Sequence, residues 1–210
     1  MMRALLLAVA LSAAAPAAAQ AELSDRPVAV AAAFSPALTQ TWTSVAGRAG
    51  YSYGGGVEVA SRRFSGAVGV AAFDDRDVRP AWSATGTVYL GGGRRGGATT
   101  NALSLTAQRV RASYDEGYTL VSPAYSVSRR VSRSGSLEVA PQVTAGVAFA
   151  TGEAFRRVGA QAVGSAGVAL GFGRGATRVV VTPAVGGALS PEAAGLSFGV
   201  SVGVLSGFGR

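Results

Sequence analysis

The chain has 210 residues, a formal net charge of +8 and a mean hydropathy of +0.32, and it contains no histidine, no cysteine and no lysine. Without histidine and cysteine it lacks Ser–His and Cys–His nucleophiles, imidazole bases and the usual zinc and haem ligands. Beyond the N-terminal segment, no apolar run approaches the roughly 18 residues that a helical membrane span needs. We therefore expect neither an enzyme, nor a cofactor or metal site, nor a helical membrane protein.

The first residues have the three parts of a secretory signal. Arg3 supplies the positive charge, an apolar run centred on Leu5–Leu7 follows, and Ala19-Gln20-Ala21 fits the small-x-small cleavage rule. We expect residues 1–21 to be a signal peptide and residues 22–210 to form a single exported domain. A protein exported without cysteines has no disulfides, so its core or its backbone hydrogen bonds must hold it together.

The last segment shows most clearly an alternation of apolar with small or polar residues that recurs in the rest of the chain. Apolar residues occupy one parity and small or polar residues the other: Leu196, Phe198, Val200, Val202 and Val204 against Ser197, Gly199, Ser201 and Gly203. Side chains of a strand alternate between its two faces, so the pattern predicts a strand with one apolar and one small, polar face.

The same pattern recurs along the exported part of the chain. It predicts ten strands, over residues 27–34, 49–60, 64–73, 82–90, 101–110, 118–129, 136–149, 160–172, 178–189 and 196–208. Residues 35–48 form a loop, a continuation of the first strand or an extra strand; eight strands is the alternative count if two segments are not strands. Pro141 and Pro183 fall inside predicted strands and therefore require bulges or positions that donate no ladder hydrogen bond.

These features together predict an all-β fold: a closed, antiparallel, up-and-down transmembrane β-barrel of about ten strands. The chain is apolar, has 30 glycines that disfavour long helices, and shows period-two patterning behind an export signal. The second parity consists of Gly, Ala, Ser and Thr, which suit a narrow lumen better than a solvated surface. A soluble exported β-sandwich or lipocalin-like carrier is the competing fold, and it would bury the apolar parity.

The connections between the predicted strands alternate in charge. One set carries most of the acids, and the other carries arginines: Arg62, Arg63, Arg94, Arg95, Arg129, Arg130, Arg133 and Arg174. Every second connection of an up-and-down barrel lies at the same rim, so we expect a basic periplasmic rim that also holds both chain ends. The arginine pairs either bind lipid phosphates by bidentate contacts or are simply solvated, and both interpretations stay open.

Five longer polar side chains fall on the inward parity: Glu58, Gln108, Glu138, Gln142 and Arg178. A buried carboxylate needs a partner, so we expect at least one Glu–Arg contact inside the barrel. A pore would use the same residues to select solutes, whereas a narrow barrel would use them structurally.

Aromatic residues gather near the strand ends. Tyr51, Tyr53, Trp82 and Tyr118 fall near the acidic connections, and Phe64, Phe172 and Phe208 fall near the arginine-rich ones. Their joint placement is typical of the two aromatic girdles at the membrane interfaces.

With its export signal, period-two strands, short basic turns and aromatic-ended last strand, the chain resembles the small outer-membrane β-barrel families, such as OmpX and the OmpA transmembrane domain. The resemblance is architectural and covers residues 27–208. In those families a terminal aromatic residue helps the barrel-assembly machinery to recognise the last strand; here Gly209 and Arg210 follow Phe208. No catalytic or binding motif comes with the resemblance.

We therefore expect a non-enzymatic integral protein of the bacterial outer membrane with a structural or surface role. A narrow passive channel for small solutes is the alternative, followed by the soluble carrier. The expected partners are outer-membrane lipid, lipopolysaccharide and the barrel-assembly machinery, and nucleic acid is not expected because the protein is exported.

Overall fold

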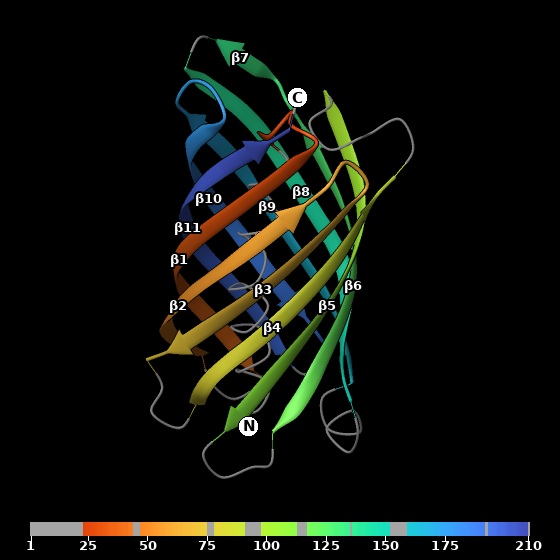
Figure 1. Ribbon diagram of the computed structural model, residues 1–210. Coiled ribbons are helices and arrows are strands. Elements are labelled where there is room, and N and C mark those ends of the chain that lie inside the picture. The colour runs from red at the N-terminus through yellow and green to blue at the C-terminus, as the bar shows by residue number, and fades with distance from the viewer. Residues whose placement is uncertain are drawn as a thin grey trace.

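The computed structural model describes residues 23–43, 47–74, 78–90, 98–112, 117–134, 136–151, 159–191 and 193–209. They form one antiparallel sheet that curls into a barrel of tilted strands (Figure 1). The strands are β1 (Val28–Thr43), β2 (Gly47–Ala60), β3 (Phe64–Phe73), β4 (Val78–Tyr89), β5 (Thr99–Ala112), β6 (Tyr118–Arg129), β7 (Ser132–Ser134), β8 (Leu137–Ala150), β9 (Ala160–Phe172), β10 (Thr177–Leu189) and β11 (Ala193–Phe208). Within these residues, no helix has the length and hydropathy needed to cross a membrane.

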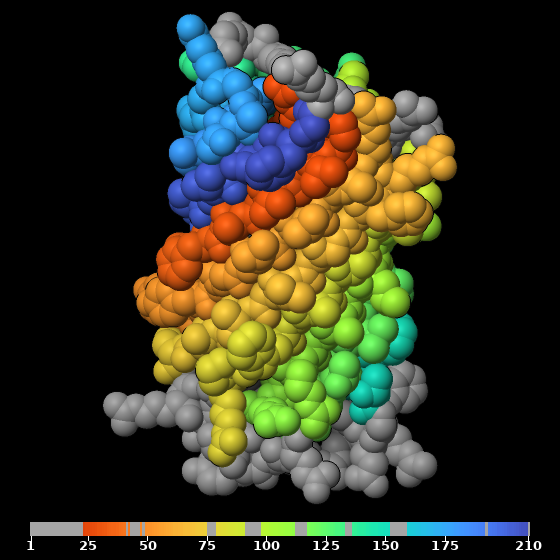
Figure 2. Space-filling model, viewed as in Figure 1, coloured from red at the N-terminus to blue at the C-terminus, as the bar shows by residue number. Residues whose placement is uncertain are grey.

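The barrel closes because the first strand pairs with the last. β1 and β11 are joined from Val28↔Phe208 to Thr43↔Ala193, and Figure 2 shows the two ends of the colour scale side by side. On the other side β6 pairs directly with β8, so the three-residue β7 only extends one end of the wall. Ten long strands therefore form the barrel, and the predicted count of ten is confirmed.

Residues 35–48, which the sequence left open, mostly continue the first strand. β1 runs through Ser35 to Thr43 and pairs with β2, for example at Leu38↔Tyr51. β2 in turn begins at Gly47, ahead of its predicted start. The strands β1 and β11 are consequently the longest of the barrel, with 16 residues each.

The apolar parity faces outward along the whole wall. Val57, Val68, Leu189 and Phe198 are all exposed, whereas their sequence neighbours on the other parity lie inside. A soluble β-sandwich or lipocalin-like carrier would bury these side chains inside the fold, so that alternative is wrong for this structure. An exterior of this kind is compatible with hydrocarbon, and each of the ten long strands pairs with a strand on both sides.

Prolines interrupt the ladder at matched positions. Ser/Thr-Pro-Ala occurs on β1, β6 and β10, and at each proline the pairing to one neighbouring strand has a gap. A glycine of the neighbouring strand faces each proline carbonyl; the pairs are Pro36 with Gly199, Pro123 with Gly146 and Pro183 with Gly167. Proline has no N–H to donate, and glycine lets the two backbones approach closely.

Pro141 is accommodated in a different way. It lies on β8 where that edge changes partner, between Ser128↔Gln142 of the β6 pairing and Ser132↔Val139 of the β7 pairing. Both prolines noted in the sequence, Pro141 and Pro183, therefore sit at interruptions of the ladder, as predicted.

The close approach of the two backbones at the Pro–Gly pairs predicts an effect of a glycine substitution on stability. A Cβ added at Gly146 would lie 2.4 Å from the Pro123 carbonyl oxygen. We expect Gly146→Ala to lower the free energy of unfolding by about 1–3 kcal/mol, because the two strands would have to separate. Urea unfolding of vesicle-inserted protein, followed by gel mobility without boiling, measures the change.

Gly86→Ala on β4 is the matched control, since nothing lies within 4 Å of an added Cβ there. Equal urea midpoints for the two variants would contradict the proposed close approach.

Candidate functional site

The candidate site is the barrel interior, which differs along its length. At the rim of the arginine-rich connections it is filled by a small apolar cluster, made of Leu23, Ala29, Ala31, Ala60, Ala140, Ala169, Val180 and Leu205. We call this region the closed end. Most of its members are alanines, because a narrow barrel leaves room for little more than small side chains.

A buried charge cluster lies at the closed end. Glu138 on β8 is only 2% exposed and forms ion pairs with the Arg178 guanidinium and with Nε of Arg130. Arg130 Nη1 also donates to Asp25 Oδ1 at 2.7 Å. Two carboxylates and two guanidiniums thus balance one another, which a low-dielectric interior requires. The Glu138–Arg178 pair is the internal Glu–Arg contact that the sequence predicts.

The same cluster ties down the segment that precedes β1. Arg130 Nη2 donates to the carbonyl oxygen of Leu23 at 3.3 Å, and the Leu23 side chain is 1% exposed. Arg26 Nη1 donates to the Gly209 carbonyl oxygen at 3.0 Å, which links this segment to the end of β11. Residues 23–26 therefore pack into and across the closed end.

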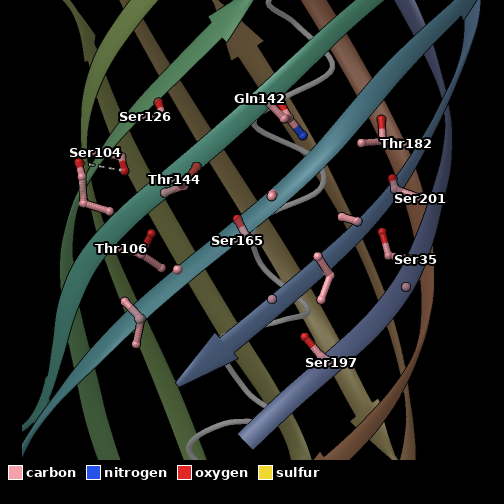
Figure 3. A pocket seen from close by; sticks show the side chains of 18 of the residues that line it. Ser35, Ser104, Thr106, Ser126, Gln142, Thr144, Ser165, Thr182, Ser197 and Ser201 are labelled. Atoms are coloured by element: carbon pink, nitrogen blue, oxygen red, sulfur yellow. Dashed lines mark hydrogen bonds between the residues drawn. The ribbon is translucent and has the colours of Figure 1, made fainter. Parts of the chain in front are cut away.

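The middle of the barrel is a different environment. Polar side chains from eight strands line a cavity of about 160 Å³ (Figure 3). Its polar lining residues are Ser35, Thr85, Thr87, Ser104, Thr106, Gln108, Ser122, Ser126, Ser128, Gln142, Thr144, Ser165, Thr182, Ser197 and Ser201. No charged residue is among the described lining. Because hydroxyls both donate and accept, this surface suits water or neutral hydrogen-bonding solutes.

The five inward candidates from the sequence separate into two groups. Glu138 and Arg178 meet at the closed end, and the fully buried Glu58 lies on β2 opposite Ala31 of that end. Gln108 and Gln142 instead line the hydroxyl cavity. Gln108 Oε1 is buried there and has no hydrogen-bond partner among the described residues.

The predicted basic rim is only partly a surface feature. Arg62, Arg63, Arg129 and Arg174 are exposed, as a rim requires. Arg130 differs, because its guanidinium turns inward to Glu138 and Asp25 instead of facing lipid or water. Arg94, Arg95 and the side chain of Arg133 lie outside the described residues.

The aromatic residues follow the two predicted levels, with one exception. Tyr51, Tyr53 and Trp82 are exposed near one rim, and Phe64, Phe172 and Phe208 are exposed near the other. Tyr118 is buried inside the barrel, so its assignment to a girdle is wrong. On β6 it shares a parity with Leu120 and Ser122, which are both inward.

Sequence reasoning missed the role of residues 23–26. They precede the first strand and carry no periodic pattern, so nothing marks them as interior. The charge of Asp25 was the available signal, since it is an acid at the rim where arginine dominates.

A closed antiparallel barrel that is apolar outside and polar inside, with aromatic residues at both edges of the apolar band, defines the class of protein. It is an outer-membrane-type β-barrel. Among the described residues, no group of three or more His, Cys, Asp or Glu could hold a metal ion.

No protein-family model matches the chain, and no curated protein sequence matches it. Solved structures with a similar fold include the translocator domain of the autotransporter NalP from Neisseria meningitidis, at 12% identity and a TM-score of 0.45, covering 99% of this chain and 95% of that one. The outer-membrane protease OmpT from Escherichia coli has 11% identity and a TM-score of 0.44, covering 88% of this chain and 97% of that one. Neisserial surface protein A has 11% identity and a TM-score of 0.37, covering 86% and 99%. At these values the likenesses concern the fold alone.

The charge cluster yields a stability prediction. Glu138→Gln keeps the shape of the side chain but removes the carboxylate that Arg178 and Arg130 share, and leaves Arg130 paired with Asp25 alone. We expect the free energy of unfolding to fall by about 3 kcal/mol, because both arginine side chains are mostly buried. Urea unfolding in vesicles measures it.

Arg62→Gln removes one charge from the exposed rim and serves as the control, with an expected change within about 0.5 kcal/mol. If Glu138→Gln were as stable as that control, the cluster would not hold the closed end together.

Proposed function

We propose that this chain is a non-enzymatic integral protein of the bacterial outer membrane, exported with a cleaved signal peptide, with a structural or surface role. The exposed apolar band supports the membrane part of this proposal. Side chains such as Phe198 and Val68 would order water over a continuous surface, but they cost nothing in hydrocarbon.

The filled closed end is the observation that favours a structural or surface role over conduction. A passive solute would have to pass Leu23, the alanine layer and the Glu138 ion pairs, which occupy the same cross-section. Displacing them would expose a buried charge cluster and break the contacts of residues 23–26. The lumen is therefore closed at this end of the barrel.

The absence of histidine and cysteine from the whole chain supports a non-enzymatic role. Among the interior carboxylates, Glu138 is engaged in ion pairs with two arginines. The many lumen hydroxyls belong to Ser and Thr, which need an activating base to become nucleophiles.

A narrow channel is the second candidate, and the hydroxyl cavity favours it. Its uncharged, water-compatible lining is supplied by eight of the strands around the barrel. The two candidates differ in one physical respect, namely whether the closed end opens.

We also propose that the arginine-rich rim faces the periplasm and that β11 engages the assembly machinery. The described chain enters at Leu23 and leaves at Gly209 on that rim, as an even-stranded barrel requires. β11 closes the barrel against β1, so before closure its outer edge is free to pair with another strand.

The membrane assignment predicts a fractionation result. Expressed with its own leader in a Gram-negative host, the protein should remain in the membrane pellet after alkaline carbonate extraction. It should also migrate faster on a detergent gel when it is not boiled, because the closed ladder stays folded. Recovery of folded protein in the soluble fraction would show that the exterior is not solvated by lipid.

The closed end predicts the absence of conductance. The purified protein should give no stepwise current in a planar bilayer at moderate voltage, although a general porin added to the same bilayer does. Reproducible single-channel steps from the wild type would establish the channel and overturn the closed-wall proposal.

A further inference from the structure

The exterior carries a group of arginines at the rim opposite the closed end. Arg79 on β4 and Arg109 and Arg111 on β5 are all exposed. We call these three residues the arginine patch. Arginine pointing away from a barrel is unfavourable wherever it meets hydrocarbon, so its position needs a physical reason.

A β-bulge places Arg79 in the patch. β4 pairs with β5 at Arg79↔Arg111 and next at Trp82↔Arg109, so three steps on β4 correspond to two on β5. By simple alternation Arg79 would share the inward face of Ala81, which is buried. The bulge, at Pro80 and Ala81, turns Arg79 to the outer face, directly opposite Arg111. Bulges often redirect a side chain in this way.

The resulting arrangement is repulsive on its own. The Cβ atoms of two residues directly opposite each other on antiparallel strands lie about 5 Å apart, and like-charged pairs at such positions are destabilising. Arg109 Nη1 donates to Thr119 Oγ1 at 3.3 Å. Within the described part of the chain, neither Arg79 nor Arg111 contacts a carboxylate; Asp74 lies beside Gly50 on the inner side of β2. An external anion would relieve this repulsion.

The patch lies at the edge of the apolar band. On β5 the outward residues between Asn101 and Arg109 are Leu103, Leu105 and Ala107. The nine residues from Asn101 to Arg109 match the roughly 9–11 residues of a tilted membrane strand. Trp82, opposite Arg109 and 67% exposed, marks the same edge. The arginines therefore begin where lipid headgroups begin.

We propose that the arginine patch binds the phosphate groups of a phosphorylated glycolipid of lipid A type in the outer leaflet. This inference rests on the proposed function, because the opposite rim must face the periplasm. Guanidinium forks bind phosphate oxygens bidentately, and Trp82 supplies a surface for the adjoining acyl chains and sugar.

The test uses the mature barrel refolded in dodecyl maltoside micelles. A Trp42→Phe background leaves Trp82 as the remaining tryptophan, so its fluorescence reports binding beside Arg109. Diphosphorylated lipid A is titrated into the micelles, and dephosphorylated lipid A and inorganic phosphate are titrated separately. The variants are Arg79→Gln/Arg111→Gln and the control Arg62→Gln/Arg63→Gln, which removes the same charge from the other rim.

We expect diphosphorylated lipid A to bind the wild type and the control within about twofold, and to bind the patch variant about tenfold or more weakly. Dephosphorylated lipid A and inorganic phosphate should bind poorly to all three. Equal affinity of the patch variant, or equal binding of dephosphorylated lipid A, would overturn the proposal. Strong binding of inorganic phosphate would indicate a site for free anions instead.

Gel mobility without boiling shows whether each variant is folded, and Arg111→Gln alone provides a milder change should the double variant fail to fold. The single variant is expected to weaken binding by about threefold to tenfold, and unchanged affinity would count against the patch. The micelle titration is independent of the fractionation and conductance experiments. Loss of lipid A binding with correct membrane fractionation would therefore overturn this inference and leave the proposed function standing.

Discussion

The structure depends on the closure of one hydrogen-bonded ladder. In hydrocarbon an unpaired backbone group costs several kcal/mol, so a sheet is stable there only if its first and last strands pair. The β1–β11 pairing meets this requirement from one end of the strands to the other, apart from the gap at Pro36. It also explains the tolerance for interruptions at Pro36, Pro123 and Pro183, since each gap is short and a facing glycine keeps the two strands close.

Closure also determines what the interior can hold. With ten strands the lumen is narrow, so alanine, glycine, serine and threonine fill most inward positions. The charged inward side chain of Glu138 lies where it finds partners, between Arg130 and Arg178. The interior is thereby divided into an ion-paired, packed end and a neutral, hydroxyl-lined middle. The outer surface is graded in a similar way, from exposed arginines through an apolar band to Trp82 and the arginine patch.

The local sequence pattern was sufficient to predict which side chains of the strands face outward, but not which distant segments contact one another. Alternation along residues such as Leu196–Phe208 predicted which side chains face outward, because a strand has only two faces. It could not show that β1 continues through Pro36, since proline normally ends such a pattern. It also missed the bulge at Pro80–Ala81, which reverses the face of Arg79, and it placed Arg130 on the rim because the charge of a side chain does not reveal its direction.

The amino-acid sequence by itself indicated about ten strands, with eight as the alternative. It determined the apolar exterior and the small-residue interior, because these follow from a two-residue period and from side-chain size. It also indicated that an inward glutamate would meet an arginine. Only the tertiary structure decided which residues meet: that Glu138 joins Arg130 and Arg178, that Asp25 and Leu23 close one end, and that Arg79 faces Arg111. These contacts depend on strand register and on the curvature of the closed wall, which bring together residues as far as 107 positions apart that no local pattern connects.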